Sequence, residues 1–315
     1  MSRPRAHHFV PQFLLRRWAD ADGRVQAWRW DGDQVRSFRV RPSETAHVRN
    51  LYARELVPPD EQHNVERFLS VLEARAAVAI DAAVSGDFKR LPDEHLHALA
   101  VFMIASHVRL PHHVDHMRAQ GRRVVEEALS RPDPDFERLN TTPARNLLEW
   151  TQQHNPARIA NFGIDTLPGV VLRGGSLDKL IKMQWMLADF KSTPFEALIS
   201  DRPLVLYGGI DHPQHLQAFA IGPRHVIFAA PSGETLNRIT RWMPRDVLRS
   251  FNQAVVGQCT RFAYGRAEAR FIEKYLPRSP PASRFPIEPN SGAPLRQQEP
   301  GAHAGEWRPA LGLAE

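Results

Sequence analysis

The strongest structural constraint in this sequence is a run of apolar residues between Glu61 and Val84, spaced as on one face of an α-helix. Its members recur at intervals of three and four residues: Val65, Phe68, Leu69, Leu72, Ala76, Ala79, Ile80 and Ala83. Such spacing places them along one stripe of a helix, with polar residues on the other side. The run therefore predicts a long amphipathic helix.

Helical spacing recurs in other parts of the chain. A short helix is expected over 11–19, where Pro11 suits a first helical turn. A second is expected from Pro92 to about Leu110, where Pro111 disfavours continuation. Further helices are expected over 111–165 (several short ones, broken at Pro132, Pro134 and Pro156), after Ser176 (with Leu180, Met183, Leu187 and Phe190 on one face) and over 244–276.

Strand signals occur at two places. Residues 24–40 alternate in polarity around Asp31-Gly32-Asp33, which predicts an antiparallel hairpin. Short apolar runs separated by Gly and Pro follow at 198–199, 204–206, 218–221 and 226–228. The expected fold is therefore α+β and predominantly helical, with a short N-terminal hairpin and a small antiparallel sheet in the C-terminal half.

Length and composition predict one mostly helical domain over 1–276 and a flexible Pro-rich tail over 277–315. Cys259 is the sole cysteine, so no internal disulfide can form, which favours the cytoplasm. The longest apolar-rich stretch, 96–110, is interrupted by His, Ser and Arg, so no membrane segment is expected. The net charge of +6 permits a nucleic acid or another phosphate-bearing ligand as partner without requiring one.

The densest polar cluster opens the chain, where His7, His8 and Gln12 precede the first expected helix. Imidazoles titrate near neutrality and are common metal ligands, so His7 and His8 are candidates for proton transfer or for holding a divalent metal. The alternative is structural: His8 packs and bonds backbone groups while His7 faces water. The sequence leaves the cofactor unknown.

Two further candidates come from distant segments. Ser200 and Asp201 lie between two predicted strands, where polar active-site residues are common, although such side chains also bond nearby backbone amides to fix a turn. Arg109 ends a predicted helix, where it either opposes the helix dipole or clamps an anion.

Other arrangements are weaker. His112 and His116 are spaced to chelate a metal on a helix, but a solvated histidine-rich helix start is the simpler interpretation. Glu66 and Glu73 project from similar faces of the long helix, so they suit a metal or a proton-transfer site, or are solvated charges. The usual phosphate-loop, dinucleotide, hydrolase-elbow and zinc-helix motifs are absent.

Taken together, these landmarks resemble a bacterial family, the domain of unknown function numbered 4238. The resemblance spans roughly residues 6–265. It is carried by His7-His8-Phe9-Val10-Pro11-Gln12-Phe13-Leu14-Leu15, Asn50-Leu51-Tyr52, the helix with Glu66 and Glu73, Arg109-Leu110-Pro111, Ile199-Ser200-Asp201-Arg202-Pro203, Ile221-Gly222-Pro223-Arg224 and Asn252.

The resemblance implies a functional role for the polar residues at matching positions, namely His7, His8, Gln12, Arg109, Ser200 and Asp201. It supplies no substrate. Two positions depart from the family pattern: Arg202 stands where Asn is usual, and Phe9 where Tyr or another aromatic residue is usual. The opening His-His string is also similar to the start of the His-Asn-His nuclease motif, although His47 and Asn50 follow in a different arrangement.

Two functions remain open. In the first, the chain is a hydrolase of the phosphodiesterase or nuclease type, with His7 or His8 as base or ligand. Asp201 orients that histidine or shares a metal with it, and the substrate is bound by Arg109, Gln12 and Ser200. In the second, the same polar groups form a non-catalytic ligand-binding or sensing module. The sequence does not decide whether the chain is an enzyme.

Overall fold

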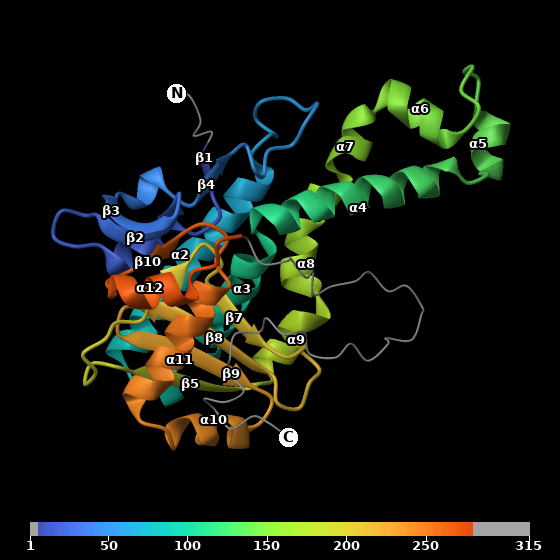
Figure 1. Cartoon of the computed structure of the whole chain (residues 1–315). Helices are drawn as coiled ribbons and strands as arrows, with labels where there is room; N and C mark the ends of the chain where they lie inside the picture. The colour runs from blue at the N-terminus through green and yellow to red at the C-terminus, as the bar shows by residue number, and fades with distance from the viewer. Residues whose placement is uncertain (1–5, 280–315) are drawn as a thin grey trace.

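The computed structural model describes residues 6–279, and most of the predicted tail lies outside this range (Figure 1). Within it, α2 (Asn64–Ser85) is the predicted long amphipathic helix and lies against α3 (Asp93–Val108). Both helices carry buried apolar residues, among them Leu69, Ile80 and Phe102. This helical pair is the frame on which the N-terminal segment sits.

The N-terminal hairpin is confirmed. β2 (Val25–Asp31) pairs antiparallel with β3 (Gln34–Val40), and Gly32 has a φ of 61°, as a tight turn requires. Two late strands extend the sheet in the order β3-β2-β10-β6: β10 (Ala263–Tyr264) and β6 (Ile199–Ser200). The hairpin is therefore part of a sheet shared with the C-terminal half.

The antiparallel sheet of the C-terminal half is also confirmed, and the fold is mixed α+β. Its order is β5-β9-β8-β7, from β5 (Gln184–Asp189), β7 (Leu204–Tyr207), β8 (Leu216–Gly222) and β9 (His225–Ala230). In Figure 1, α11 (Pro244–Gly257) lies on the viewer's side of it, and α10 (Gly233–Thr240) lies below it. Helix α3 packs against it through Phe102, whose ring lies 5.7 Å from that of Phe219.

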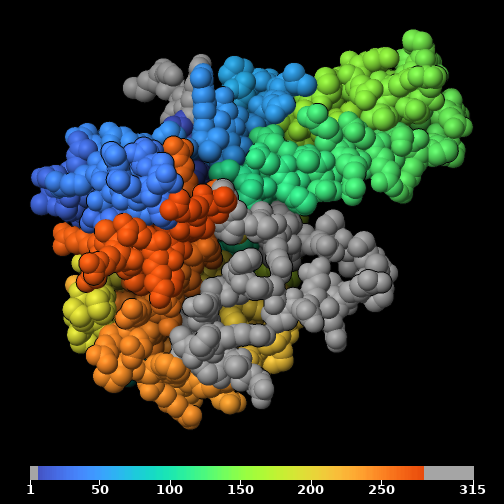
Figure 2. Space-filling model, in the orientation of Figure 1, coloured from blue at the N-terminus to red at the C-terminus, as the bar shows by residue number. Residues whose placement is uncertain are grey.

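The region 111–165 departs from the prediction of several short helices. Its first element, α4 (Pro111–Ser130), is long and continuous, because Pro111 takes the first-turn position where proline is tolerated. The shorter helices follow: α5 (Pro134–Leu139), α6 (Leu147–His154) and α7 (Pro156–Asp165). Together these four helices form an arm that projects from the rest of the molecule in Figures 1 and 2.

Two predicted helices were wrong in extent. Helix α9 (Gly175–Ile181), which follows α8 (Leu167–Arg173), ends early because Leu187 lies in β5 and pairs with Ile227. The predicted helix over 244–276 is interrupted by β10, and α12 (Ala269–Tyr275) follows it. In both places sheet pairing overrides the helical spacing of the apolar residues.

The small elements at the N-terminus position the predicted histidines. Strand β1 (Ala6–His8) pairs antiparallel with β4 (His47–Arg49), and α1 (Gln12–Leu15) with η1 (Arg16–Trp18) forms the predicted first helix. The remaining short helices are η2 (Pro42–Glu44) and η3 (Phe88–Arg90). Over residues 6–279, every helix falls short of the length or apolar content that a membrane span requires.

Candidate functional site

His7 is held inside the protein by the loop that carries Tyr52. Only 1% of His7 is exposed, and its ring stacks on the Tyr52 ring at a centroid distance of 5.5 Å. Its Nδ1 accepts a hydrogen bond of 2.9 Å from the backbone N–H of Tyr52. A neutral His7 must therefore carry its proton on Nε2. That Nε2 is buried and has no hydrogen-bond partner within residues 6–279.

The surroundings of His7 keep it uncharged at neutral pH. Burial is the main cause that lowers its pKa to about 4, and His63, His8 and Arg109 lower it further through their charges. The ring of His63 lies edge-on at 5.6 Å. Since the lone pair of Nδ1 is already engaged, His7 is arranged to donate a hydrogen bond rather than to accept a proton.

Arg109 ties three segments together from the end of α3. Its Nη1 lies 2.7 Å from Glu73 Oε1, its Nη2 donates to the carbonyl of His8 at 2.5 Å, and its Nε lies 3.4 Å from the Tyr52 hydroxyl. That hydroxyl in turn donates to the Arg109 carbonyl at 2.8 Å. Burial works to lower the pKa of Arg109, but Tyr52 and Glu73 outweigh it and raise that pKa, so the guanidinium stays charged.

Glu66 lies two helical turns before Glu73 on α2, and the charge of each carboxylate interacts with that of Arg109. Its Oε2 is buried and has no partner among the described residues, whereas Glu73 is paired. Burial raises the pKa of Glu66 to about 7, with a smaller increase from Glu73 and an opposing effect of Arg109. We call His7, Tyr52, Glu66, Glu73 and Arg109 the Arg109 cluster.

His8 and Gln12 lie at the half-buried side of the Arg109 cluster. Gln12 Nε2 is 3.4 Å from His8 Nδ1, and Gln12 Oε1 accepts a hydrogen bond of 3.1 Å from Arg16. The His47 ring lies edge-on to the His8 ring at 5.2 Å. Burial first, and then His47, lowers the pKa of His8. The backbone carbonyl of His8, rather than its ring, contacts Arg109.

Asp201 does not join the Arg109 cluster but is hydrogen-bonded to the loop before β10. Its carboxylate accepts three backbone N–H bonds, from Thr260, Arg261 and Phe262, at 2.6 to 3.0 Å, and only 3% of the residue is exposed. Burial raises its pKa to about 6 against these three donors. Over residues 6–279, no hydrogen bond or ion pair joins Asp201 to His7, His8 or Arg109. These contacts match the structural interpretation of Asp201.

Ser200 has equally local bonds. Its hydroxyl donates to the Arg202 carbonyl at 2.9 Å and accepts from the Arg202 N–H at 3.2 Å. Such bonds close a turn. The structure thus brings His7, the His8 backbone and Arg109 together and leaves Ser200 and Asp201 with turn contacts of their own.

The histidines after Pro111 form a separate group. The His112 ring lies 4.1 Å from that of His113, whose Nδ1 lies 2.6 Å from the His107 carbonyl. Burial, His113 and Arg202 lower the pKa of His112 to about 3. No set of three or more His, Cys, Asp or Glu side chains within residues 6–279 is arranged to hold a metal ion.

Sequence reasoning did not single out Tyr52, His63 or His47 as site residues. Tyr52 is the residue that contacts both His7 and Arg109, and it is fully buried. Its only sequence signal was the Asn50-Leu51-Tyr52 string, in which Asn50 adopts a φ of 56° and turns the chain. A polar aromatic residue directly after such a turn is the sequence feature by which Tyr52 could have been predicted as a site residue.

The family comparison agrees with the landmarks that converge here. The family described as "Protein of unknown function (DUF4238)" matches residues 6–269, which include every member of the Arg109 cluster. No curated protein and no solved structure matches the chain significantly. By a match over most of its length, this chain belongs to the DUF4238 family.

Proposed function

We propose that this protein is a non-catalytic ligand-binding or sensing module, and that a small polar molecule binds at the Arg109 cluster. The observation that carries the proposal is a pair of buried polar atoms without partners, His7 Nε2 and Glu66 Oε2, in a network that is otherwise bonded. Buried polar groups in native proteins are nearly always bonded, so such exceptions mark sites where a ligand or water completes the network.

The energetics favour a ligand that bonds both atoms. A buried donor or acceptor without a partner costs about 1–3 kcal/mol, which a bound molecule recovers. His7 offers an N–H, and Glu66, with a pKa near 7, offers either an O–H or a carboxylate oxygen. The matching ligand is a small polar molecule that presents a hydrogen-bond acceptor to His7 and a hydroxyl, amide or amine to Glu66.

Arg109 then acts as a positioning residue. Its guanidinium is bonded to Glu73, to the His8 carbonyl and to Tyr52, and only 1% of the residue is exposed, so it is poorly placed to clamp an anion. Its role under this proposal is to hold β1, the Tyr52 loop and α2 in the arrangement that leaves His7 and Glu66 free.

A second function, hydrolysis, is favoured by one observation. The pKa of Glu66 is raised to about 7 by burial, and a carboxyl group of that pKa is a competent general acid at neutral pH. In this version Glu66 protonates a leaving group, as in a phosphodiesterase or nuclease. Asp201 then acts through the fold rather than as the partner of His7 or His8.

The test is thermal shift of the wild-type chain against a panel of divalent metals, nucleotides, oligonucleotides and small amides. A binding module is stabilised by a compound that is recovered unchanged. The shift is expected to vanish in Glu66→Gln, an isosteric change, and to persist in Glu273→Gln, which alters an exposed carboxylate on α12.

The other outcomes discriminate between the two functions. Turnover of a compound that is lost in Glu66→Gln would replace binding by hydrolysis. A shift that survives in Glu66→Gln would place the ligand outside the Arg109 cluster and overturn the proposal, as would a panel without any stabilising compound.

We keep the cytoplasm as the proposed location. The support is Cys259, the sole cysteine, which is buried and unpaired in the structure.

A further inference from the structure

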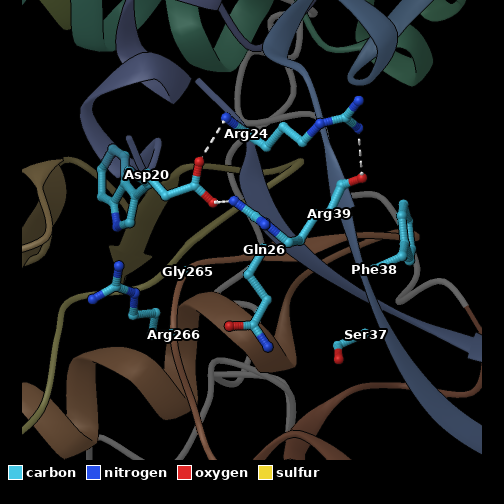
Figure 3. A pocket seen from close by; sticks show the side chains of 9 residues that line it. Asp20, Arg24, Gln26, Ser37, Phe38, Arg39, Gly265 and Arg266 are labelled. Atoms are coloured by element: carbon cyan, nitrogen blue, oxygen red, sulfur yellow. Dashed lines mark hydrogen bonds and ion pairs between the residues drawn. The ribbon is translucent and has the colours of Figure 1, made fainter. Parts of the chain in front are cut away.

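A pocket lies on the N-terminal sheet and shares no residue with the Arg109 cluster (Figure 3). Its volume is about 340 Å³, which is within the range of small-molecule sites. It is formed by β2, β3, the end of η1 with the segment that follows it, and the segment after β10. The residues that line it are Trp18, Asp20, Arg24, Gln26, Ser37, Phe38, Arg39, Gly265 and Arg266.

The lining carries an excess of positive charge. Arg24, Arg39 and Arg266 face a single acidic lining residue, Asp20. Both Asp20 oxygens are engaged within the protein: Oδ1 accepts the backbone N–H groups of Asp22 and Arg24, and Oδ2 pairs with Arg39. The carboxylate therefore offers little to a cationic ligand.

Arg39 and Arg24 are fixed at the rim. Arg39 also pairs with Asp22 at 2.9 Å, and the Arg24 guanidinium donates to the Arg39 carbonyl at 3.4 Å. Two carboxylates, Asp20 and Asp22, thus offset the charge of Arg39 and hold it in place. Within residues 6–279 neither Arg24 nor Arg266 pairs with a carboxylate, and of the two only Arg266 has a guanidinium without a hydrogen bond.

Three lining side chains have no hydrogen bond or ion pair within residues 6–279: the Arg266 guanidinium, the Gln26 amide and the Ser37 hydroxyl. Gln26 and Ser37 lie on neighbouring strands, because Gln26 pairs with Arg39 and Ser37 with Trp28. Arg266 comes from a segment more than two hundred residues later in the chain. Hydrogen-bond donors from two distant segments therefore line the same pocket.

Gly265 allows the segment that carries Arg266 to lie close to β2. Its φ is 116°, a conformation that side chains disfavour, and a Cβ there would lie 2.9 Å from Leu198 Cδ2. Its N–H donates to the Gln26 carbonyl at 2.9 Å, and its carbonyl accepts from Trp28 Nε1 at the same distance. These bonds fix the backbone from which Arg266 extends.

We propose that this pocket binds a small molecule through an oxyanion group, a phosphate or a carboxylate. Arg266 supplies the charge in a planar, bidentate form, and the Gln26 amide and the Ser37 hydroxyl add neutral donors. The site is independent of the Arg109 cluster, where the proposed ligand is bound by the buried N–H of His7 and the carboxyl group of Glu66.

The test is isothermal titration calorimetry of the full chain with inorganic phosphate and, separately, with malonate. Saturable binding is expected, and the titrant with the higher affinity identifies the oxyanion. Arg266→Ala and Gln26→Glu are each expected to weaken binding by about tenfold or more, through loss of charge and through repulsion. Arg270→Ala and Gln34→Glu make the same two changes at exposed residues outside the pocket and are expected to bind like the wild type.

Failure of both titrants to saturate the wild-type chain would overturn the proposal. Equal weakening in the pocket variants and their controls would also overturn it, since it would show a diffuse charge effect. If Gln26→Glu fails to fold in circular dichroism, Arg266→Ala decides, because Arg266 is exposed. Glu66→Gln is expected to leave phosphate binding unchanged, so this site and the proposed function fail separately.

Discussion

Arg109 Nη1 lies 2.7 Å from Glu73 Oε1, and this ion pair joins the end of α3 to the middle of α2 beneath the N-terminal strand. The Arg109 side chain is 2% exposed and that of Glu73 25%. Because the guanidinium also holds the His8 carbonyl, the position of β1 depends on it.

Removal of Glu73 should leave a buried guanidinium without its anionic partner. Breaking a buried pair costs roughly 3–5 kcal/mol, and the partial exposure of Glu73 places Glu73→Ala near the lower end, at about 3 kcal/mol. Urea unfolding measures the change. The control is Glu127→Ala, which breaks an exposed pair with Arg131 and should cost only about 0–1 kcal/mol. Equal losses in both variants would show that the Arg109–Glu73 pair is no more than a surface contact.

The Glu66 carboxyl group should make the free energy of unfolding fall as pH rises, which is the opposite of the usual effect of a carboxylate that is paired in the folded state. Its pKa rises from 4.5 to about 7 on folding, so the folded state binds more protons than the unfolded state between these values. This contribution stabilises the fold below about pH 4.5 and is lost as pH rises to about 7. His7, with a folded pKa near 4, acts in the opposite direction over pH 4 to 6.5.

The Glu66 contribution is isolated by comparison with Glu66→Gln. The stability of that variant relative to the wild type should grow with pH from about 4.5 to about 7 and then level off. Urea unfolding at a series of pH values measures the difference, with Glu273→Gln as the exposed control. A difference that does not change with pH would mean that Glu66 titrates normally.

Asp201 should prove to be a structural residue. Asp201→Ala leaves three backbone N–H groups without their acceptor, and a single hydrogen bond to a charged group contributes about 1.5–3 kcal/mol, so the loss should exceed that of Ser200→Ala. Thermal melting by circular dichroism gives the order. If Asp201→Ala instead melts like the wild type and abolishes a ligand-induced shift, Asp201 belongs to the site.

The arm depends on the contact between α4 and α7. A Cβ on Gly121 would lie 2.5 Å from the backbone nitrogen of Gly163, so Gly121→Ala must push the two helices apart and should cost about 1–3 kcal/mol. The control is Gly169→Ala in α8, where a Cβ meets open space and alanine's helix propensity should add roughly 0.5–1 kcal/mol. Chemical unfolding compares the two. A stabilised Gly121→Ala would contradict the close approach of the helices.

Local patterns were enough to predict much of the fold. The spacing of apolar residues gave α2 and α3, and the turn sequence around Gly32 gave the β2–β3 hairpin. The same reasoning failed at Leu187 and beyond Gly257, where short apolar runs suit a helix as well as a strand. Pairing with β9 and β2 decided those segments, and neither partner is close in sequence.

For the candidate site, the sequence by itself determined which polar side chains the chain has available, including His7, Glu66, Arg109 and Asp201. Only the tertiary structure decided which of them meet. The packing of α2 against α3 brings Glu73 to Arg109, and the loop at Asn50 brings Tyr52 between Arg109 and His7. Asp201 is bonded by a segment sixty residues later. Such contacts depend on how the whole chain buries its apolar surface, which no local pattern encodes.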